Sequence, residues 1–321
     1  MTSLPIRSVA VVGAGLMGHG IAQVFAQAGY PVALYDKDPA ALERALAGIR
    51  ANLRLLEEHG LSTPTAAEQT LARLTLAHDL APAVAGVDLV VEAVYEDLAV
   101  KQEVFHTLDR LCPPTTILAS NTSGLSATAL AQATSRPDRV LVTHFWNPPH
   151  LIPLVEVVRA PTTSEATVQT VVALLRAVGK VPVVVQKDIP GFVGNRLQYA
   201  LFREAVALVQ AGVVSPEDVD TVVRLSLGRR YGVIGPLETA DLNGVDLFAR
   251  IAHYLYPTLD CAQDTQPYHQ RLVAEGRLGV RVGRGFYDWT PERAQARIRE
   301  RDAELLRWLR RDRGLDGERA I

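Results

Sequence analysis

The feature that most constrains this chain is a set of three glycines directly after a short β-branched run. Val9–Val12 is typical of a strand, and Gly13, Gly15 and Gly18 follow it with the spacing Gly-x-Gly-x-x-Gly. Between a strand and a helix, the first glycine permits a tight turn, the second lets backbone approach a pyrophosphate, and the third lets the helix pack on the sheet. The helix N-terminus then offers free amides to phosphate groups. We therefore predict a dinucleotide-binding loop that consists of Gly13, Ala14, Gly15, Leu16, Met17 and Gly18.

An acidic residue at the end of the second predicted strand indicates which dinucleotide binds. Asp36 lies 18 residues beyond Gly18, close to the spacing of a ribose-binding carboxylate. Such a carboxylate accepts hydrogen bonds from the ribose hydroxyls and repels a 2′-phosphate. The neighbouring Lys37 could offset part of that repulsion. The sequence favours NAD over NADP.

The first part of the chain alternates strand-like runs with helical segments such as Ala40–Glu58 and Val100–Leu111. This alternation predicts an α/β fold with a Rossmann-type doubly wound sheet and helices on both of its faces. Eight runs are expected to be strands: Val9–Val12, Val32–Tyr35, Leu74–Ala77, Leu89–Val94, Ile117–Ser120, Val140–Thr143, Leu154–Val158 and Val181–Val185.

After residue 188 the pattern becomes helical throughout. Gly191–Gly212 has apolar residues at helical spacing, and Ser215 precedes a proline and two acids, as at a helix start. The nine arginines and seven acidic residues of Pro291–Ile321 indicate an amphipathic terminal helix laced with ion pairs. We predict a nucleotide-binding domain over residues 1–188 and an all-helical substrate and dimerisation domain over residues 189–321.

Composition excludes several other classes of protein. The formal net charge of −2 gives no reason to expect nucleic acid or a membrane surface as partner. No apolar run approaches the roughly 20 residues that a transmembrane helix needs. Two isolated cysteines argue against a disulfide scaffold or a cysteine zinc site, and we expect no bound metal. A strand-like run close to the start leaves no room for a signal peptide, which favours a cytoplasmic protein.

A histidine and a glutamate are predicted to meet across a hairpin. Two strand-like runs flank Asn147-Pro-Pro149, and an antiparallel fold-back about residue 150 would place His144 opposite Glu156. Cross-strand partners have β-carbons about 4.5–5.5 Å apart, within reach of a carboxylate–imidazole hydrogen bond. The pair could then take a proton from a substrate hydroxyl. His150 lies in the turn itself, where we expect exposure to solvent rather than a role as base.

Three further polar residues are candidates for the same site. Ser123 follows the fifth predicted strand, at the sheet edge where α/β proteins bind ligands. Asn195 lies inside a predicted helix, where helix capping does not explain it. Lys101 is one of only four lysines, which hints weakly at a specific partner, but a solvated helix face is the default interpretation.

Taken together, the motifs resemble the 3-hydroxyacyl-CoA dehydrogenase family from about residue 7 to Trp289. The resemblance implies NAD-dependent oxidation of an L-3-hydroxyacyl-CoA to the 3-ketoacyl-CoA, as in β-oxidation of fatty acids, and a homodimer formed through the helical domain. It implies His144 as base, Glu156 as its orienting partner, and Ser123 and Asn195 as ligands of the substrate oxygens. Contacts with the nicotinamide end of the cofactor are implied for Glu96, Lys101, Ser123 and Asn147, and a cofactor contact for Arg281. The motifs that carry the resemblance are Gly13–Gly18, Ser120–Leu125, His144–Pro148, Leu154–Val157, Pro190–Arg196 and Gly283–Tyr287.

The chain departs from the acyl-CoA pattern in Ala40–Gly60. Where mitochondrial-type members carry a serine and a lysine that contact CoA, the corresponding positions are Asn52 and His59. Asn147-Pro-Pro149 and Gly235–Thr239 are similar to the λ-crystallin/L-gulonate 3-dehydrogenase branch, and a pyridine-carboxylate dehydrogenase branch shares the Asn-Pro-Pro-His stretch. A CoA-free hydroxy-acid dehydrogenase is therefore one alternative, and a non-catalytic NAD-binding structural protein is a second.

Overall fold

The computed structural model describes residues 6–315, which divide into two compact units. The first unit comprises the chain up to Asn195 together with residues from Arg301 onward, and the second is Arg196–Glu300. Among the described residues no helix is long and apolar enough to cross a membrane.

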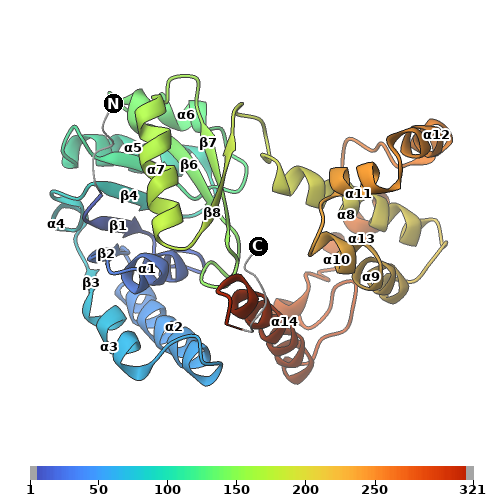
Figure 1. Cartoon of the computed structure of the whole chain (residues 1–321), viewed down its shortest axis with the longest axis horizontal. Coiled ribbons are helices and arrows are strands. Elements are labelled where there is room, and N and C mark those ends of the chain that lie inside the picture. The colour runs from blue at the N-terminus through green and yellow to red at the C-terminus, as the bar shows by residue number, and fades with distance from the viewer. Residues whose placement is uncertain (1–5, 316–321) are drawn as a thin grey trace. The chain divides into compact units, whose positions relative to one another are not determined.

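The first unit is built on an eight-stranded sheet with the order β3-β2-β1-β4-β5-β6-β7-β8 (Figure 1). Strands β1 to β6 run parallel, β7 pairs antiparallel with β6, and β8 is parallel to β7. All eight predicted strands are present, and the predicted Rossmann-type sheet is confirmed. Their bounds are β1 Val9–Val12, β2 Val32–Tyr35, β3 Leu74–Ala77, β4 Leu89–Glu92, β5 Ile117–Ser120, β6 Val140–Phe145, β7 Leu154–Arg159 and β8 Val181–Val185.

Helices cover both faces of the sheet, as continuous apolar strands require. One buried cluster joins the sheet to α1, α2 and α7, with Phe25, Ile49 and Leu175 fully buried. The other joins it to α4, α5 and α6, with Phe105 and Leu130 fully buried. The helices of this unit are α1 Gly18–Gln27, α2 Pro39–Glu58, α3 Pro64–Ala72, α4 Leu80–Val84, α5 Leu98–Leu111, α6 Ala127–Ala131 and α7 Glu165–Ala177, with the 3₁₀ turn η1 Pro137–Arg139.

The second unit is helical, and its described residues form only isolated β-bridges between short segments. Ser215 caps α9, as predicted, by accepting a hydrogen bond from the Asp218 amide. The helices that contribute to this unit are α8 Gly194–Gln210, α9 Pro216–Leu225, α10 Leu227–Tyr231, α11 Pro236–Asn243, α12 Val245–Leu255, α13 Pro267–Ala274 and α14 Pro291–Asp312, with the 3₁₀ turns η2 Tyr256–Thr258 and η3 Val280–Val282.

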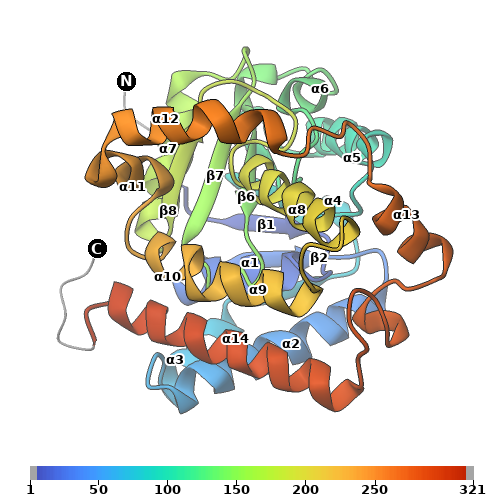
Figure 2. The same ribbon diagram turned by 90° about the vertical axis from the view of Figure 1, so that its right-hand side faces the viewer.

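The C-terminal part of α14 differs from the expectation that residues 189–321 form one domain. From Arg301 onward the chain belongs to the first unit. The reason is apolar packing: Leu305, Leu306 and Leu309 form a cluster with leucines at the end of α2. Figure 2 shows α14 beside α2. The last residues of the predicted terminal helix, 316–321, lie outside the described part of the chain.

Candidate active site

The glycine loop has the shape that a dinucleotide requires. Gly13 adopts φ 106°, and a Cβ on Gly18 would lie 1.7 Å from the Gly13 carbonyl oxygen, so neither position accepts a side chain. At Gly15 a Cβ would meet no atom within 4 Å, which leaves space for a pyrophosphate against bare backbone. Helix α1 begins at Gly18 and directs its amino end to this loop.

Asp36 joins the glycine loop to the end of β2. Its Oδ2 accepts a hydrogen bond from the Ala14 amide (2.8 Å) and its Oδ1 accepts one from the Asp38 amide (2.9 Å). An ionised carboxylate has about four acceptor positions, so two remain for ribose hydroxyls. The loop and Asp36 together fit NAD.

The predicted pairing of His144 with Glu156 is confirmed. The two residues are register partners on β6 and β7, and His144 Nδ1 lies 2.8 Å from Glu156 Oε2. Both side chains are buried. Because a carboxylate only accepts hydrogen bonds, Nδ1 carries the hydrogen and Nε2 is left as the acceptor. The geometry is that of a general base held in one tautomer.

Glu156 also holds the start of α8, a contact that the sequence did not reveal. Its Oε1 accepts hydrogen bonds from the amides of Val193 (2.9 Å) and Gly194 (3.0 Å). Burial alone would raise the pKa of Glu156, but the hydrogen bonds from His144, Gly194 and Val193 outweigh it and hold the pKa below its usual value. The carboxylate therefore stays ionised beside the imidazole.

Two aromatic rings surround the His144 imidazole. The Trp146 ring centroid is 5.1 Å from that of His144, and the Phe192 centroid is 5.8 Å away. Phe192 is fully buried and adopts a left-handed φ of 51°, which directs its ring to the histidine. Sequence reasoning missed both rings, although each lies within a motif that carries the family resemblance.

Ser123 and Asn195 come together as predicted for substrate ligands. Asn195 Nδ2 donates to the Ser123 carbonyl oxygen (2.7 Å), which ties the start of α8 to the loop after β5. Ser123 is exposed, and its amide donates to Glu96 Oε1 (2.8 Å). Their roles toward a substrate remain predictions.

The interpretation of Lys101 as a solvated helix residue is wrong. Its side chain is 1 % exposed, and Nζ donates to Glu92 Oε1 (2.7 Å) because α5 packs on the end of β4. Glu96 Oε2 lies 3.3 Å from the same nitrogen. Glu92, which sequence reasoning did not single out, is completely buried.

Of the two polar turn residues, Asn147 and His150, the second differs from its expected exposure to solvent. Asn147 is exposed at the end of β6, followed by a cis bond to Pro148. His150 is half-buried rather than exposed. Burial, followed by the charges of His19, Lys180 and Arg301, lowers the pKa of His150 to about 4. A neutral, half-buried His150 is no better a candidate for the base than the sequence implied.

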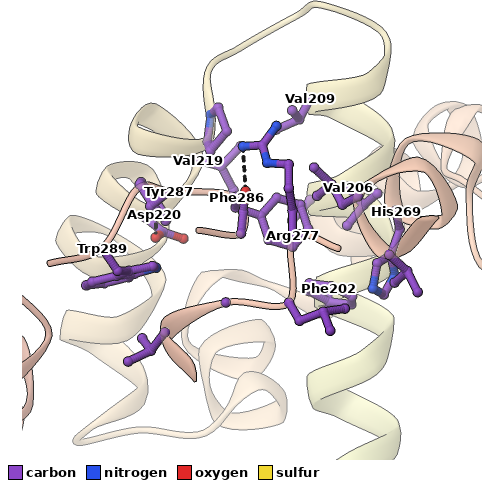
Figure 3. A pocket seen from close by; sticks show the side chains of 18 of the residues that line it. Phe202, Val206, Val209, Val219, Asp220, His269, Arg277, Phe286, Tyr287 and Trp289 are labelled. Carbon is purple, nitrogen blue, oxygen red and sulfur yellow. Dashed lines mark hydrogen bonds between the residues drawn. The ribbon is translucent and has the colours of Figure 1, made fainter. Parts of the chain in front are cut away.

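Arg281 lies in the second unit, at a cavity of about 540 Å³. Apolar and aromatic side chains from α8, α9, α13 and residues 277–289 line the cavity (Figure 3). Asp220 accepts a hydrogen bond from the Tyr287 hydroxyl there (2.7 Å). Arg281 is the one predicted site residue that lines this cavity, and its contact with a cofactor stays a prediction.

Two family models match most of the chain. The family model described as 3-hydroxyacyl-CoA dehydrogenase, NAD binding domain, matches residues 8–189, and the model of the C-terminal domain of the same enzymes matches residues 191–289. Both family models end before α14.

Among residues 6–315 there is no group of three or more His, Cys, Asp or Glu side chains able to hold a metal.

Two relatives of this chain are named for different substrates. The chain is 40% identical over 301 residues to 5-formyl-3-hydroxy-2-methylpyridine 4-carboxylate 5-dehydrogenase of Mesorhizobium japonicum, covering 94% of this chain and 96% of that one. It is 42% identical over 287 residues to a probable 3-hydroxybutyryl-CoA dehydrogenase of Bacillus subtilis, covering 89% and 98%. A crystal structure of a pyridine carboxylate 5-dehydrogenase, described as an NAD⁺-dependent dismutase, superposes with a TM-score of 0.90 at 39% identity over 98% of this chain and 100% of that one.

Proposed function

Because the chain belongs to the 3-hydroxyacyl-CoA dehydrogenase family and is an NAD-dependent dehydrogenase of that type, we propose that it oxidises a small carboxylated substrate that carries no CoA. The reacting group is a hydroxyl on carbon, or the hydrate of an aldehyde, which presents the same C–H and O–H bonds. The observation that carries this proposal is the packing of α14 on the end of α2.

In the proposed reaction, His144 Nε2 takes the proton of the substrate hydroxyl. Glu156 stabilises the imidazolium through Nδ1, 2.8 Å away. Ser123 and Asn195 hold the substrate oxygen in line with the base. Asp36 and the glycine loop would hold the cofactor, and NAD held there would supply the acceptor for the hydride that leaves the same carbon.

The end of α2 is covered by the chain itself. Leu305, Leu306 and Leu309 of α14 pack with Leu55, Leu56, Leu61 and Leu151. Arg310 Nη1 also donates to the His59 carbonyl oxygen (2.8 Å), and Arg313 Nη1 donates to that of Leu61 (2.9 Å). The family resemblance implies that His59 corresponds to one of the CoA contacts, and on that correspondence the packing of α14 would restrict access of a CoA handle.

The other CoA position is also engaged within the protein. Asn52 Nδ2 donates to Gln23 Oε1 (2.9 Å), and Gln23 is completely buried in α1. An uncharged amide committed to a buried partner offers little to a CoA phosphate. The pyridine 4-carboxylate relative, which aligns over 94% of this chain, is a similar protein named for a substrate without CoA.

L-3-hydroxyacyl-CoA is the second candidate substrate, and the family model and the 42% identical relative favour it. The two candidates separate in one assay of NADH formation. We expect turnover with 5-formyl-3-hydroxy-2-methylpyridine 4-carboxylate, free L-3-hydroxybutyrate or L-gulonate, faster with NAD than with NADP. Turnover confined to L-3-hydroxybutyryl-CoA would overturn the CoA-free proposal and restore a role in β-oxidation.

We also propose a homodimer formed through the helical unit. Large apolar side chains of α9, α11 and α12 are exposed in the single chain, among them Val222, Leu237, Leu242 and Tyr254. Large apolar side chains that remain exposed in such number favour a protein interface on this unit. We expect light scattering to give twice the mass of one chain, and Leu242→Glu to give a monomer. Val183→Glu, an exposed valine at the edge strand β8, is the matched control and should stay dimeric; a wild-type monomer at micromolar concentration would contradict the proposal.

A further inference from the structure

A buried charge cluster lies at the carboxyl end of β4, and its central member is Glu92. The side chain is completely buried and accepts three hydrogen bonds. Oε1 accepts from the Val94 amide (2.7 Å) and from Lys101 Nζ (2.7 Å), and Oε2 accepts from Ser120 Oγ (2.6 Å). Glu92 therefore joins β4, α5 and β5 at the edge of the sheet where the cofactor binds.

Lys101 links Glu92 to a second carboxylate, that of Glu96. Its Nζ has three acceptors, namely Glu92 Oε1, the Val94 carbonyl oxygen (3.2 Å) and Glu96 Oε2 (3.3 Å). An ammonium group has three hydrogens, so the group is fully engaged. Lys101 is held in one position by two carboxylates on opposite sides.

Glu96 in turn fixes the loop that carries the predicted substrate ligand. Its Oε1 accepts from Thr122 Oγ1 (2.5 Å) and from the Ser123 amide (2.8 Å). The Ser123 carbonyl oxygen accepts from Asn195. A continuous path of hydrogen bonds thus runs from Glu92 to both residues expected to hold the substrate oxygen.

The cluster also carries charge next to the glycine loop. A Cβ on Gly13 would lie 2.6 Å from the Ala93 carbonyl oxygen, so the loop lies directly against the residue that follows Glu92. Two carboxylates and one ammonium leave one net negative charge there. The charge role rests on the predicted contact of Glu96 with the nicotinamide end of the cofactor. The oxidised nicotinamide ring is positively charged and the reduced ring is neutral, so a net negative charge at that contact favours NAD⁺ over NADH.

Stability alone does not account for this arrangement. Burying two ions costs several kcal/mol each, and well-packed apolar side chains of similar volume are often as stable or more stable. We propose that Glu92 is a positioning residue, which acts through Lys101 and Glu96 to fix Ser123 and to keep one net negative charge beside the nicotinamide of bound NAD. The inference rests on the proposed function for the role of Ser123, but its charge effect does not require any substrate.

The test compares Glu92→Gln with the double variant Glu92→Gln/Lys101→Met. In the single variant the cluster becomes neutral, and we expect the Kd ratio of NAD⁺ to NADH, measured by fluorescence titration, to rise about fivefold. The double variant removes one charge of each sign, so that ratio should stay at the wild-type value. With Lys101 gone, however, Glu96 and Ser123 lose their anchor, and we expect kcat to fall about 10-fold or more at a similar KM.

The matched control is Asp109→Asn/Arg136→Met, which removes another largely buried ion pair from the opposite end of α5. Its thermal midpoint should fall, while the Kd ratio and kcat stay unchanged. An unchanged Kd ratio in Glu92→Gln would overturn the charge role, and wild-type kcat in the double variant would overturn the positioning role. If the double variant does not fold, the ratio of Kd values in Glu92→Gln still tests the charge role. Failure of the proposed function would instead appear as wild-type protein without turnover on any substrate of the panel.

Discussion

The His144→Gln variant is expected to lose at least about 10²-fold in kcat while it binds NADH with unchanged affinity. Glutamine fills much of the space of the imidazole, but its amide has no nitrogen that can take up a proton near neutral pH. The glycine loop follows β1 and Asp36 follows β2, whereas His144 is on β6. The contacts with the pyrophosphate and the ribose are therefore intact in the variant, and the affinity for NADH should stay unchanged. The measurement is steady-state turnover with the best substrate of the panel, beside fluorescence titration with NADH.

His150→Gln is the matched control for this variant. His150 lies in the same hairpin, and the structure gives it no carboxylate partner among its described contacts. Its kcat should stay within about twofold of wild type. Near-normal turnover in His144→Gln, or a large loss in His150→Gln alone, would transfer the base to another residue.

The Glu156→Gln variant should lose about 10²- to 10⁴-fold in kcat, because a carboxamide cannot serve both sets of partners of this side chain. Oε2 faces His144 Nδ1 and Oε1 faces the amides of Val193 and Gly194, which are all donors. If the new NH₂ group faces the amides, two donors meet. If it faces His144, the hydrogen moves to Nε2, and the imidazole can no longer accept the substrate proton.

The same variant makes a prediction about pH and stability. The pKa of Glu156 is held below its ordinary value of about 4.5 in the folded protein, so the ionised form stabilises the fold above that value. The difference in unfolding free energy between wild type and Glu156→Gln should be constant from neutral pH to about 4.5 and should shrink as the pH falls further. Urea titrations across that range measure it. The control is Glu165→Gln. Glu165 is an exposed glutamate of α7 that pairs with Arg159, a residue of the same strand β7 as Glu156, and this variant should retain kcat.

The strands and the central pair of the site could be predicted because each depends on local pattern. Parallel strands buried on both faces are continuously apolar, so runs such as Ile117–Ser120 stand out. The partnership of His144 and Glu156 follows from counting residues on either side of a proline turn. Neither prediction depends on how segments that are distant in the sequence pack together.

The missed features depend on packing between distant segments. Lys101 has the same type of side chain whether it is solvated or buried, and only the docking of α5 on β4 places it against Glu92. The leucines of α14 indicate an apolar face, but no pattern in α14 indicates that Leu55 and Leu61 will cover it. The burial of His150 arises in the same way, from segments far away in the chain.

The two oxygens of Glu156 give this site a property beyond orientation of its base. One oxygen bonds the imidazole that gains a proton in each turnover. The other bonds the amides of Val193 and Gly194, three and two residues before the second unit begins at Arg196. When His144 becomes positively charged, the carboxylate's electron density is drawn to Oε2, and the amide bonds at Oε1 weaken. Protonation of His144 would therefore weaken the hydrogen bonds that hold the backbone at Val193 and Gly194. This segment, through which the chain leaves the nucleotide-binding unit, would be more mobile after proton uptake than before it.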